Sequence, residues 1–261
     1  MFPHPLSVGP LHFKFYGFMV ALGVLAALGL MALTAPLRDI PASRLRDFSF
    51  WMILAGLLGS RIFYVIFHWP EFAPRPGLVF AYWRGGLMFQ GGLVTALILA
   101  PFFFRRYGLK PWPTTDAVAA PLALGQSFGR IGCFGAGCCY GRVVDDSNPI
   151  AVIFPPGSLA PAGLPMWPTQ LMEAGGLLVL AGLLFLALRS DSAYFRRPGR
   201  VAALYLFGAG LLRLTMEMLR GDYRGDPIIW GLPPTTLTAI GAVLLGLFLL
   251  TRKASAEKIP L

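Results

Sequence analysis

The sequence reads FYGFMVALGVLAALGLMAL from residue 15 to residue 33, without a charged side chain. About 20 consecutive apolar residues are enough for a helix to cross the hydrocarbon core of a bilayer. Further apolar windows follow at residues 48–67, 87–104, 115–134, 168–188, 201–218 and 235–250. We therefore predict an all-α polytopic membrane protein with about seven transmembrane helices, forming a single integral-membrane domain over residues 1–261.

The composition of the whole chain agrees with a membrane protein. Of the 261 residues, 56% are apolar and only 13% are charged, whereas about 25% of the residues in a soluble domain are charged. An ordinary cytosolic globular protein is thereby excluded. The segment before residue 15 has no basic cluster, and Pro36 follows the small residue Ala35. We therefore expect no cleaved signal peptide.

The distribution of lysines and arginines predicts the orientation of the chain. Loops one, three and five and the C-terminal tail hold thirteen of them, against six in the N-terminal segment and in loops two, four and six. Because basic residues accumulate on the cytoplasmic side, we expect a periplasmic N-terminus and a cytoplasmic C-terminus. The net charge of +10 is then a signal of topology, so we expect a lipid bilayer and no nucleic acid as partner.

The fourth predicted helix contains an unusual segment, GQSFGRIGCFGAGCCYGR, at residues 125–142. Its glycines lower helix propensity, so we expect the helix to break near residue 132. Irregular backbone at membrane depth is tolerated where it lines protein or a water-filled cavity. Close helix packing through small residues explains the glycines equally well, but it does not explain Arg130.

Arg61, Arg130, Glu173, Arg213 and Glu217 fall inside the predicted spans. A charge at the centre of a membrane helix costs roughly 2.5 to 3.5 kcal/mol, so each needs a polar partner or water. Arg213, Glu217 and Arg220 follow at spacings of four and three, which puts them on one helix face. Two interpretations remain open. One is a structural ion pair, and the other is a pocket where arginines in excess of carboxylates bind an anion such as phosphate.

The three cysteines, Cys133, Cys138 and Cys139, lie close together in the sequence. They are too few for a disulfide framework or a closed four-ligand zinc site. The histidines, which are His4, His12 and His68, are not at a ligand spacing from them. A reactive thiol beside Arg130 remains open, but small buried side chains are the simpler interpretation. We expect no metal site and no cofactor.

Five short motifs occur in order along the chain. They are FYGFM at 15–19, QGGL at 90–93, GRIGC at 129–133 with YGR at 140–142, PTQLME at 168–173 and RLTMEMLR at 213–220. Together they resemble the motifs of the prolipoprotein diacylglyceryl transferase family. The resemblance implies transfer of a diacylglyceryl group from phosphatidylglycerol to the lipobox cysteine thiol of a preprolipoprotein, with release of glycerol phosphate. It also implies a bacterial inner-membrane protein whose active site faces the periplasmic side.

Carried onto this sequence, the resemblance implies two sets of functional residues. The catalytic set is Arg130, Arg213, Glu217, Gln90 and Tyr16. The substrate-binding set is Arg130, Arg213, Arg220, Gly91, Gly92, Gln170, Glu173 and Gly141. Gln90 stands where many members have a histidine proposed as the general base, and an amide does not accept a proton near neutral pH.

Other departures from the family pattern lie in the same motifs. Cys133 and Cys138 stand where asparagine and glutamate are common, while Trp167 and Met172 replace a frequent histidine and tyrosine. These changes indicate a divergent branch of the family. The alternatives are a non-catalytic or altered-substrate membrane paralogue that binds anionic lipid and, with less support because we find no internal repeat, a small transporter.

Overall fold

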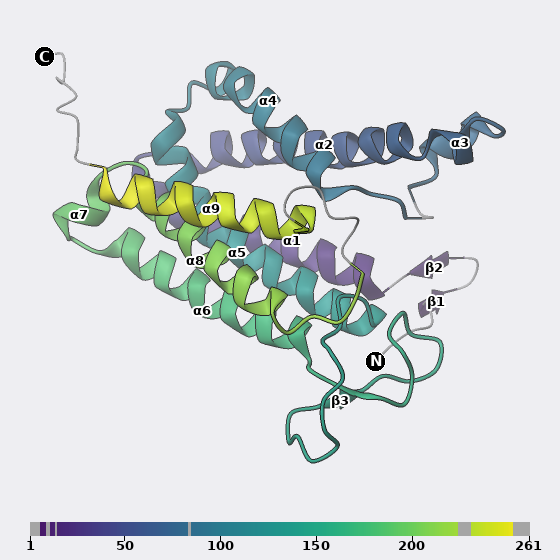
Figure 1. Cartoon of the computed structure of the whole chain (residues 1–261). Coiled ribbons are helices and arrows are strands. Elements are labelled where there is room, and N and C mark those ends of the chain that lie inside the picture. The colour runs from purple at the N-terminus through teal and green to yellow at the C-terminus, as the bar shows by residue number, and fades with distance from the viewer. Residues whose placement is uncertain (1–5, 9–10, 14, 83–84, 224–230, 253–261) are drawn as a thin grey trace, which may run out of the picture. The chain divides into compact units, whose positions relative to one another are not determined.

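The computed structural model describes residues 6–8, 11–13, 15–82, 85–223 and 231–252. Within these ranges, seven helices have between 18 and 26 residues. They are α1 (Phe15–Thr34), α2 (Ala42–Phe67), α4 (Phe89–Tyr107), α5 (Pro111–Ala136), α6 (Thr169–Arg189), α8 (Arg200–Glu217) and α9 (Pro234–Thr251), all shown in Figure 1. Each apolar window of the sequence is therefore confirmed as a helix.

The connections contain shorter elements. These are the helices α3 (Trp69–Phe72) and α7 (Ala193–Arg196), the 3-10 turns η1 (Pro36–Arg38) and η2 (Pro76–Phe80), and the strands β1 (Leu6–Val8), β2 (Leu11–Phe13), β3 (Val152–Ile153) and β4 (Pro165–Met166). Strand β1 pairs antiparallel with β2, and β3 pairs antiparallel with β4. The β3–β4 pair belongs to the long segment between α5 and α6, where Phe154 and Met166 form a small apolar core.

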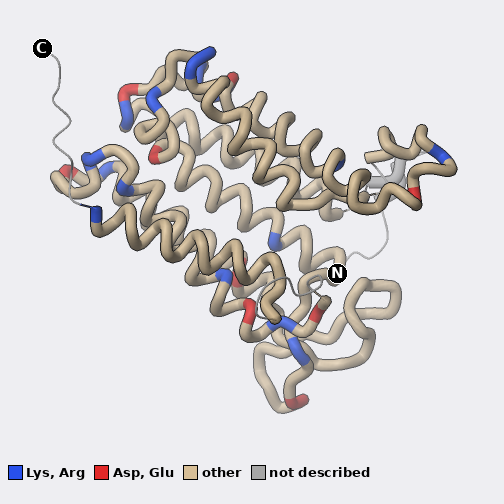
Figure 2. The backbone as a smooth tube through the Cα atoms, turned by 45° about the horizontal axis from the view of Figure 1, so that its top comes forward, with Lys and Arg blue, Asp and Glu red and all other residues tan. Residues whose placement is uncertain are grey.

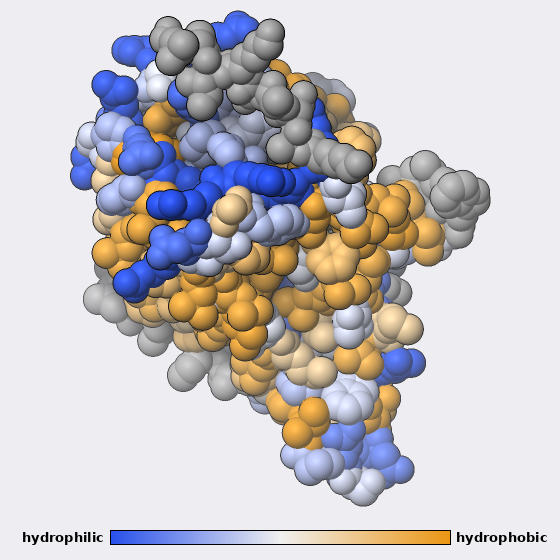
Figure 3. All heavy atoms as spheres, turned by 90° about the vertical axis from the view of Figure 1, so that its left-hand side faces the viewer, coloured by the Kyte–Doolittle hydropathy of each residue, from blue (hydrophilic) through white to orange (hydrophobic). Residues whose placement is uncertain are grey.

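Several of the helices have the length and hydropathy of membrane spans. Helices α1, α2, α6 and α9 are each long and apolar enough to cross a bilayer, and α4 and α5 meet the same criterion as a pair. Lys and Arg lie mainly at helix ends and in connecting segments (Figure 2). Hydrophobic residues cover much of the face seen in Figure 3. A mostly helical membrane protein is therefore confirmed.

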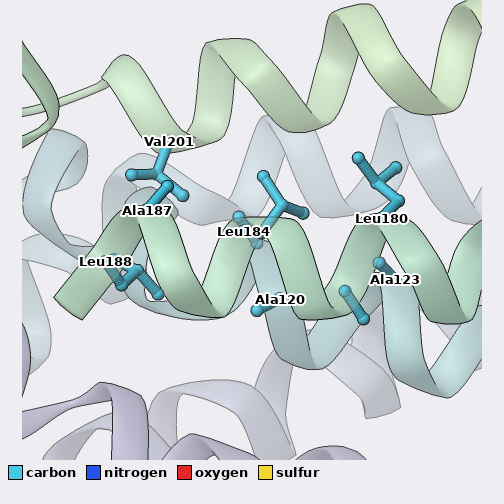
Figure 4. Packing of buried hydrophobic residues seen from close by; sticks show 9 residues of the cluster. Ala120, Ala123, Leu180, Leu184, Ala187, Leu188 and Val201 are labelled. Atoms are coloured by element: carbon cyan, nitrogen blue, oxygen red, sulfur yellow. The ribbon is translucent and has the colours of Figure 1, made fainter. Parts of the chain in front are cut away.

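The chain divides into two compact units, the first comprising Met1–Arg38 with Thr115–Leu261 and the second Asp39–Thr114. In the first unit the main apolar core forms where α5, α6 and α8 meet. Ala120 and Ala123 pack there against Leu184, with Val201 beside them (Figure 4). Small residues on one helix let the neighbouring backbone approach closely, which is how helices pack when lipid weakens the hydrophobic effect.

Helix α5 does not break near residue 132, so that prediction is wrong. The helix continues to Ala136, and its glycines allow close packing against α1. A Cβ atom on Gly132 would lie only 3.2 Å from the Tyr16 ring. Tertiary packing of this kind offsets the low helix propensity of glycine. The chain turns away only at Gly137, where φ is 74°, a left-handed value that favours glycine.

A hydrogen bond between side chain and backbone also joins α1 to α5. The hydroxyl of the buried Thr34 donates to the carbonyl oxygen of Ala117 at 2.7 Å. Thr34→Val keeps the shape of the side chain and removes the donor, so we expect a loss of about 1 kcal/mol in stability. Thermal unfolding in detergent measures this loss as a lower Tm.

The matched control is Thr238→Val. The exposed Thr238 hydroxyl donates within its own helix, to the carbonyl oxygen of Pro234 at 2.8 Å, so its loss should change stability by less than about 0.5 kcal/mol. An equal decrease in Tm for both variants would contradict the role assigned to Thr34.

Asp116 lies near the start of α5, at the opposite end of that helix from the segment that leads to β3. Its carboxylate is fully buried and accepts hydrogen bonds from the backbone N–H groups of Gly199 and Ala202, each at 2.8 Å. It also pairs with Arg38 at 3.3 Å. Because the first N–H groups of a helix lack partners within that helix, Asp116 stabilises the start of α8.

Arg61 is the charged residue of the predicted spans that belongs to the second unit. It is 3% exposed, and its guanidinium donates to the carbonyl oxygens of Leu78, Val79 and Gly85 at 2.6 to 2.9 Å. These contacts satisfy the buried charge and fix the segment between α2 and α4. We therefore interpret Arg61 as a structural residue.

Candidate active site

Three charged residues that the sequence singles out meet in the first unit. Arg130 lies on α5, Glu173 on α6 and Arg213 on α8. The Glu173 carboxylate joins the two arginines, with Oε1 at 3.1 Å from Nη2 of Arg130 and Oε2 at 3.4 Å from Nη1 of Arg213. Its side chain is only 9% exposed. The two predicted arginines therefore converge on one nearly buried carboxylate.

Glu217 extends this group along α8. Its Oε2 atom lies 3.1 Å from Nη2 of Arg213, one helical turn away, so the predicted ion pair is confirmed. The hydroxyls of Thr235 and Thr236, in the first turn of α9, each donate to Oε1 of Glu217 at 3.2 Å. Neither threonine was predicted, because nothing in the sequence relates the start of α9 to this face of α8.

Arg220 does not continue the helix face of Arg213 and Glu217, so that prediction is wrong. Helix α8 ends at Glu217, and Arg220 forms a strand-like bridge with Gly141 instead. The backbone N–H of Arg142 donates to the carbonyl oxygen of Leu219 at 2.8 Å. Pairing with the segment after α5 thus replaces the next turn of the helix.

The guanidinium of Arg220 has its own carboxylate partner. Its Nε atom donates to Oδ1 of Asp222 at 2.8 Å, and Nη2 donates to Oδ2 at 2.5 Å. Such a two-point contact is the strong geometry of an arginine–carboxylate pair. The spacing of residues on a helix face gives Arg220 no such partner, because Asp222 comes within reach only where the chain leaves the helix.

The formal charges of the site balance among the residues that the structure describes. Three arginines, Arg130, Arg213 and Arg220, face three carboxylates, Glu173, Glu217 and Asp222. The prediction that arginines outnumber carboxylates in this group is therefore wrong for the described residues. Arg130 still has donors to offer, because within the described ranges its ion pair is made by Nη2 to Glu173. Its side chain is 24% exposed, more than those of Arg213 and Arg220.

Tyr16 and Gln170 lie next to the same end of α5. The ring of Tyr16, in the first turn of α1, is the one that would meet a Cβ atom on Gly132. Gln170 is 1% exposed and donates through Nε2 to the carbonyl oxygen of Cys138 at 2.8 Å. Its Oε1 atom is buried and has no hydrogen-bond partner among the described residues. Gln170 therefore has an acceptor to offer as well as a structural contact.

Gly141, predicted as a substrate-binding residue, has a clear packing role. Its backbone N–H donates to the carbonyl oxygen of Trp167 at 3.1 Å. A Cβ atom at this position would lie 2.5 Å from Cβ of Trp167, so a larger residue would push the two segments apart. Its contact with substrate stays a prediction.

Gln90, Gly91 and Gly92 belong to the first turn of α4, in the second unit. A Cβ atom on Gly91 would lie 2.3 Å from Cβ of Phe63, and one on Gly92 would lie 2.9 Å from the carbonyl oxygen of Gly56. Both glycines therefore allow α4 to pack closely on α2. The predicted roles of these three residues toward substrate remain predictions.

The three cysteines form a cluster just after Arg130. Cys133 lies in the last turn of α5, Cys138 and Cys139 follow the helix, and the three Sγ atoms all lie within 4.8 Å of one another. All three are free thiols. Hydrogen bonds from the other two thiols lower the pKa of Cys139, and the positive charges of Arg220 and Arg130 act in the same direction. Interpreting these residues only as small buried side chains is therefore incomplete.

A sequence model described as prolipoprotein diacylglyceryl transferase matches residues 3–252. The chain belongs to this family. The resemblance carried by the five motifs is therefore confirmed, and it extends over nearly the whole chain. Every residue of the site described above falls inside the matched range.

Several curated members of the family are similar to this chain. A protein from Acinetobacter baumannii strain ATCC 17978, named phosphatidylglycerol–prolipoprotein diacylglyceryl transferase, is 37% identical over 221 residues, which cover 84% of this chain and 79% of that protein. A protein from Clostridium perfringens strain 13, named as transferase 2 of the same kind, is 32% identical over 211 residues, covering 81% and 80%. The Synechococcus elongatus transferase is 31% identical over 232 residues, covering 84% and 77%.

Proposed function

We propose that this chain transfers the diacylglyceryl group of phosphatidylglycerol to the lipobox cysteine thiol of a preprolipoprotein. The products are a thioether and glycerol phosphate. Membership of the family over residues 3–252 supports this reaction, as do the names of relatives from three bacterial groups. The convergence of Arg130 and Arg213 on Glu173 is the observation that supports this reaction at particular residues.

The two arginines suit the phosphate of the lipid. A guanidinium offers planar, paired N–H donors that match phosphate oxygens, and Arg130 has such donors beyond its contact with Glu173. In the transfer step the bond between the glyceryl carbon and its phosphate oxygen breaks, and that oxygen gains negative charge. Donors that are already in place stabilise this developing charge more than the charge of the bound lipid, which lowers the barrier.

Glu173 and Glu217 position these arginines. Each carboxylate oxygen of Glu173 contacts a different guanidinium, while Glu217 is itself held by the hydroxyls of Thr235 and Thr236. Positioned side chains of this kind keep the donors aligned before the reaction begins. We assign substrate contact to Arg130 and Arg213 and a positioning role to the two glutamates.

We also propose a multi-pass protein of the bacterial inner membrane, one integral-membrane domain with seven spans. The excess of lysines and arginines in loops one, three and five and in the C-terminal tail supports a periplasmic N-terminus and a cytoplasmic C-terminus. In this orientation the C-terminal ends of α5 and α8 and the start of α6 lie in the periplasmic half. Phosphatidylglycerol of the outer leaflet and exported preprolipoproteins are both accessible there.

The test is a transfer assay with the full chain in vesicles that contain phosphatidylglycerol labelled in its diacylglyceryl group. A peptide with a lipobox cysteine should gain the label while an equal amount of glycerol phosphate is released. A peptide with serine in place of that cysteine should gain none. Vesicles with phosphatidylethanolamine as the labelled lipid test for an altered substrate. Binding of lipid without transfer from either lipid would favour the non-catalytic paralogue and overturn the proposal.

A further inference from the structure

The cysteine cluster is the feature of the site that the proposed reaction does not yet use. Its three Sγ atoms lie within 4.8 Å of one another, although they come from a helix and from the two residues Cys138 and Cys139 beyond it. In a tetrahedral zinc site with Zn–S bonds of about 2.3 Å, neighbouring sulfur atoms are about 3.8 Å apart. Side-chain movements of about 1 Å or less therefore convert the cluster into three zinc ligands.

We propose that Cys133, Cys138 and Cys139 bind one zinc ion, whose fourth position takes the thiol of the lipobox cysteine as a thiolate. Thiolate ligands select soft or borderline metal ions such as zinc. Three cysteines are too few for a structural zinc site, but three protein ligands and one open position are the usual arrangement of a catalytic one. The inference rests on the proposed function for its substrate.

The backbone around the cysteines is held in a fixed conformation. The Thr169 hydroxyl donates to the carbonyl oxygen of Cys139 at 2.9 Å, and Gln170 donates to that of Cys138 at 2.8 Å. Cys139 itself has a φ of 61°, a left-handed value that costs energy for a residue other than glycine. Strain that is held in place by neighbouring contacts is typical of ligand sites, because it fixes the direction of a side chain.

The charges nearby suit a thiolate-rich metal site. Three thiolates and one zinc ion carry a net charge of −1, and a fourth thiolate makes it −2. Arg220 and Arg130 both interact favourably with the negative charge of Cys139. Each of these arginines also pairs with a carboxylate, but both attract this negative charge, whereas they would repel a bare cation.

The proposed zinc site also lies close to Arg130, the residue to which we assign the lipid phosphate. Cys133 follows Arg130 by three residues on α5, so the two side chains lie on the same face of the helix, one turn apart. A sulfur atom on the zinc ion and a phosphate on Arg130 thus meet at the end of α5.

The transfer step forms a C–S bond and breaks a C–O bond. Binding to zinc releases the proton of the substrate thiol to water, because a coordinated thiol is deprotonated. The sulfur electron pair forms the C–S bond to the glyceryl carbon, and the C–O bond to phosphate breaks with its electrons on oxygen. Glycerol phosphate leaves, the neutral thioether dissociates from zinc, and water returns to the fourth position. This route needs no histidine at the position of Gln90.

The first experiment measures metal content in the full chain, purified in detergent under reducing conditions. We expect about one zinc ion per chain, and a large decrease in each of Cys133→Ser, Cys138→Ser and Cys139→Ser. Ser147→Ala is the matched control, because the exposed Ser147 lies in the same connecting segment and its hydroxyl donates to Asp145. Zinc below about one tenth of an ion per chain in active wild-type protein, or a disulfide between two of these cysteines, would overturn the inference.

The second experiment uses cobalt in place of zinc as a spectroscopic probe. Cobalt bound to the wild-type protein should show sulfur-to-cobalt charge-transfer absorption, which should increase when a lipobox peptide adds a fourth thiolate. The peptide with serine should leave the spectrum unchanged. An unchanged spectrum with the cysteine peptide would overturn the role of the fourth position. This experiment uses the wild-type protein, so it does not depend on whether the cysteine variants fold.

Transfer activity separates this inference from the proposed function. Removal of zinc should lower the rate by about 100-fold, the scale of a lost acid–base contribution, and zinc but not magnesium should restore it. A full rate without zinc would overturn the inference and leave the transferase function intact. Zinc binding with the cobalt response to the cysteine peptide, but without transfer, would support the metal site and overturn the proposed function.

Discussion

Arg213→Ala is expected to lower the rate of diacylglyceryl transfer by about 100- to 1,000-fold, the usual cost of removing one donor that stabilises transition-state charge. Arg213 contacts both Glu173 and Glu217, so its loss also frees the carboxylates that hold the site together. The measurement is initial rate with labelled phosphatidylglycerol and a lipobox peptide. Because the contact strengthens in the transition state, kcat should fall by more than KM rises.

The matched control is Arg105→Ala. Arg105 is exposed in the last turn of α4, where an arginine contributes to topology and not to the proposed site. Its rate should stay within about two-fold of wild type. Near-normal turnover by Arg213→Ala, in protein that inserts and keeps its Tm, would remove Arg213 from the mechanism.

The positions of the long helices were predictable because apolar windows of membrane length have few alternatives. What the windows could not give is how a helix ends. Helix α5 passes the glycines because Gly125, Gly132 and Gly135 face α1. Helix α8 stops at Glu217 because the next residues pair with the segment around Gly141. Both outcomes depend on contacts between segments far apart in the sequence.

The candidate site was predictable in its charged residues and not in their partners. Burying a charge in a membrane requires compensation, so Arg130, Glu173 and Arg213 stood out from the sequence. Thr235 and Asp222 carry no such signal, since hydroxyl and carboxylate groups near helix ends are common. Their roles become visible only when the folded chain brings them to Glu217 and Arg220.

The cysteine cluster shows the same limit more sharply. The sequence gives three thiols and no fourth ligand, which argues against a closed zinc site. Convergence of the three Sγ atoms depends on left-handed backbone at Gly137 and Cys139. A glycine in the sequence indicates that a left-handed conformation is favourable, whereas a cysteine gives no such indication.

Glu173→Gln is expected to destabilise the protein by about 3 kcal/mol, because it removes the charge of a nearly buried carboxylate, leaves Arg130 without its ion-pair partner among the described residues, and leaves Arg213 with Glu217 alone. Transfer should fall about 100-fold as Arg130 and Arg213 move apart. Thermal unfolding and the labelled-lipid assay measure the two effects. Glu71→Gln is the matched control, since Glu71 is exposed in the first turn of α3.

A double variant separates stability from activity. Glu173→Gln combined with Arg213→Gln removes one charge of each sign, and Arg130 and Glu217 remain. We expect the double variant to lose less stability than the sum of the two single losses, by about 1 to 2 kcal/mol, because the paired side chains interact. Transfer should stay as low as in the worse single variant, since restored charge balance does not restore a phosphate donor. Additive losses of stability would show that Glu173 and Arg213 do not interact, and recovered transfer would show that their pair serves the fold alone.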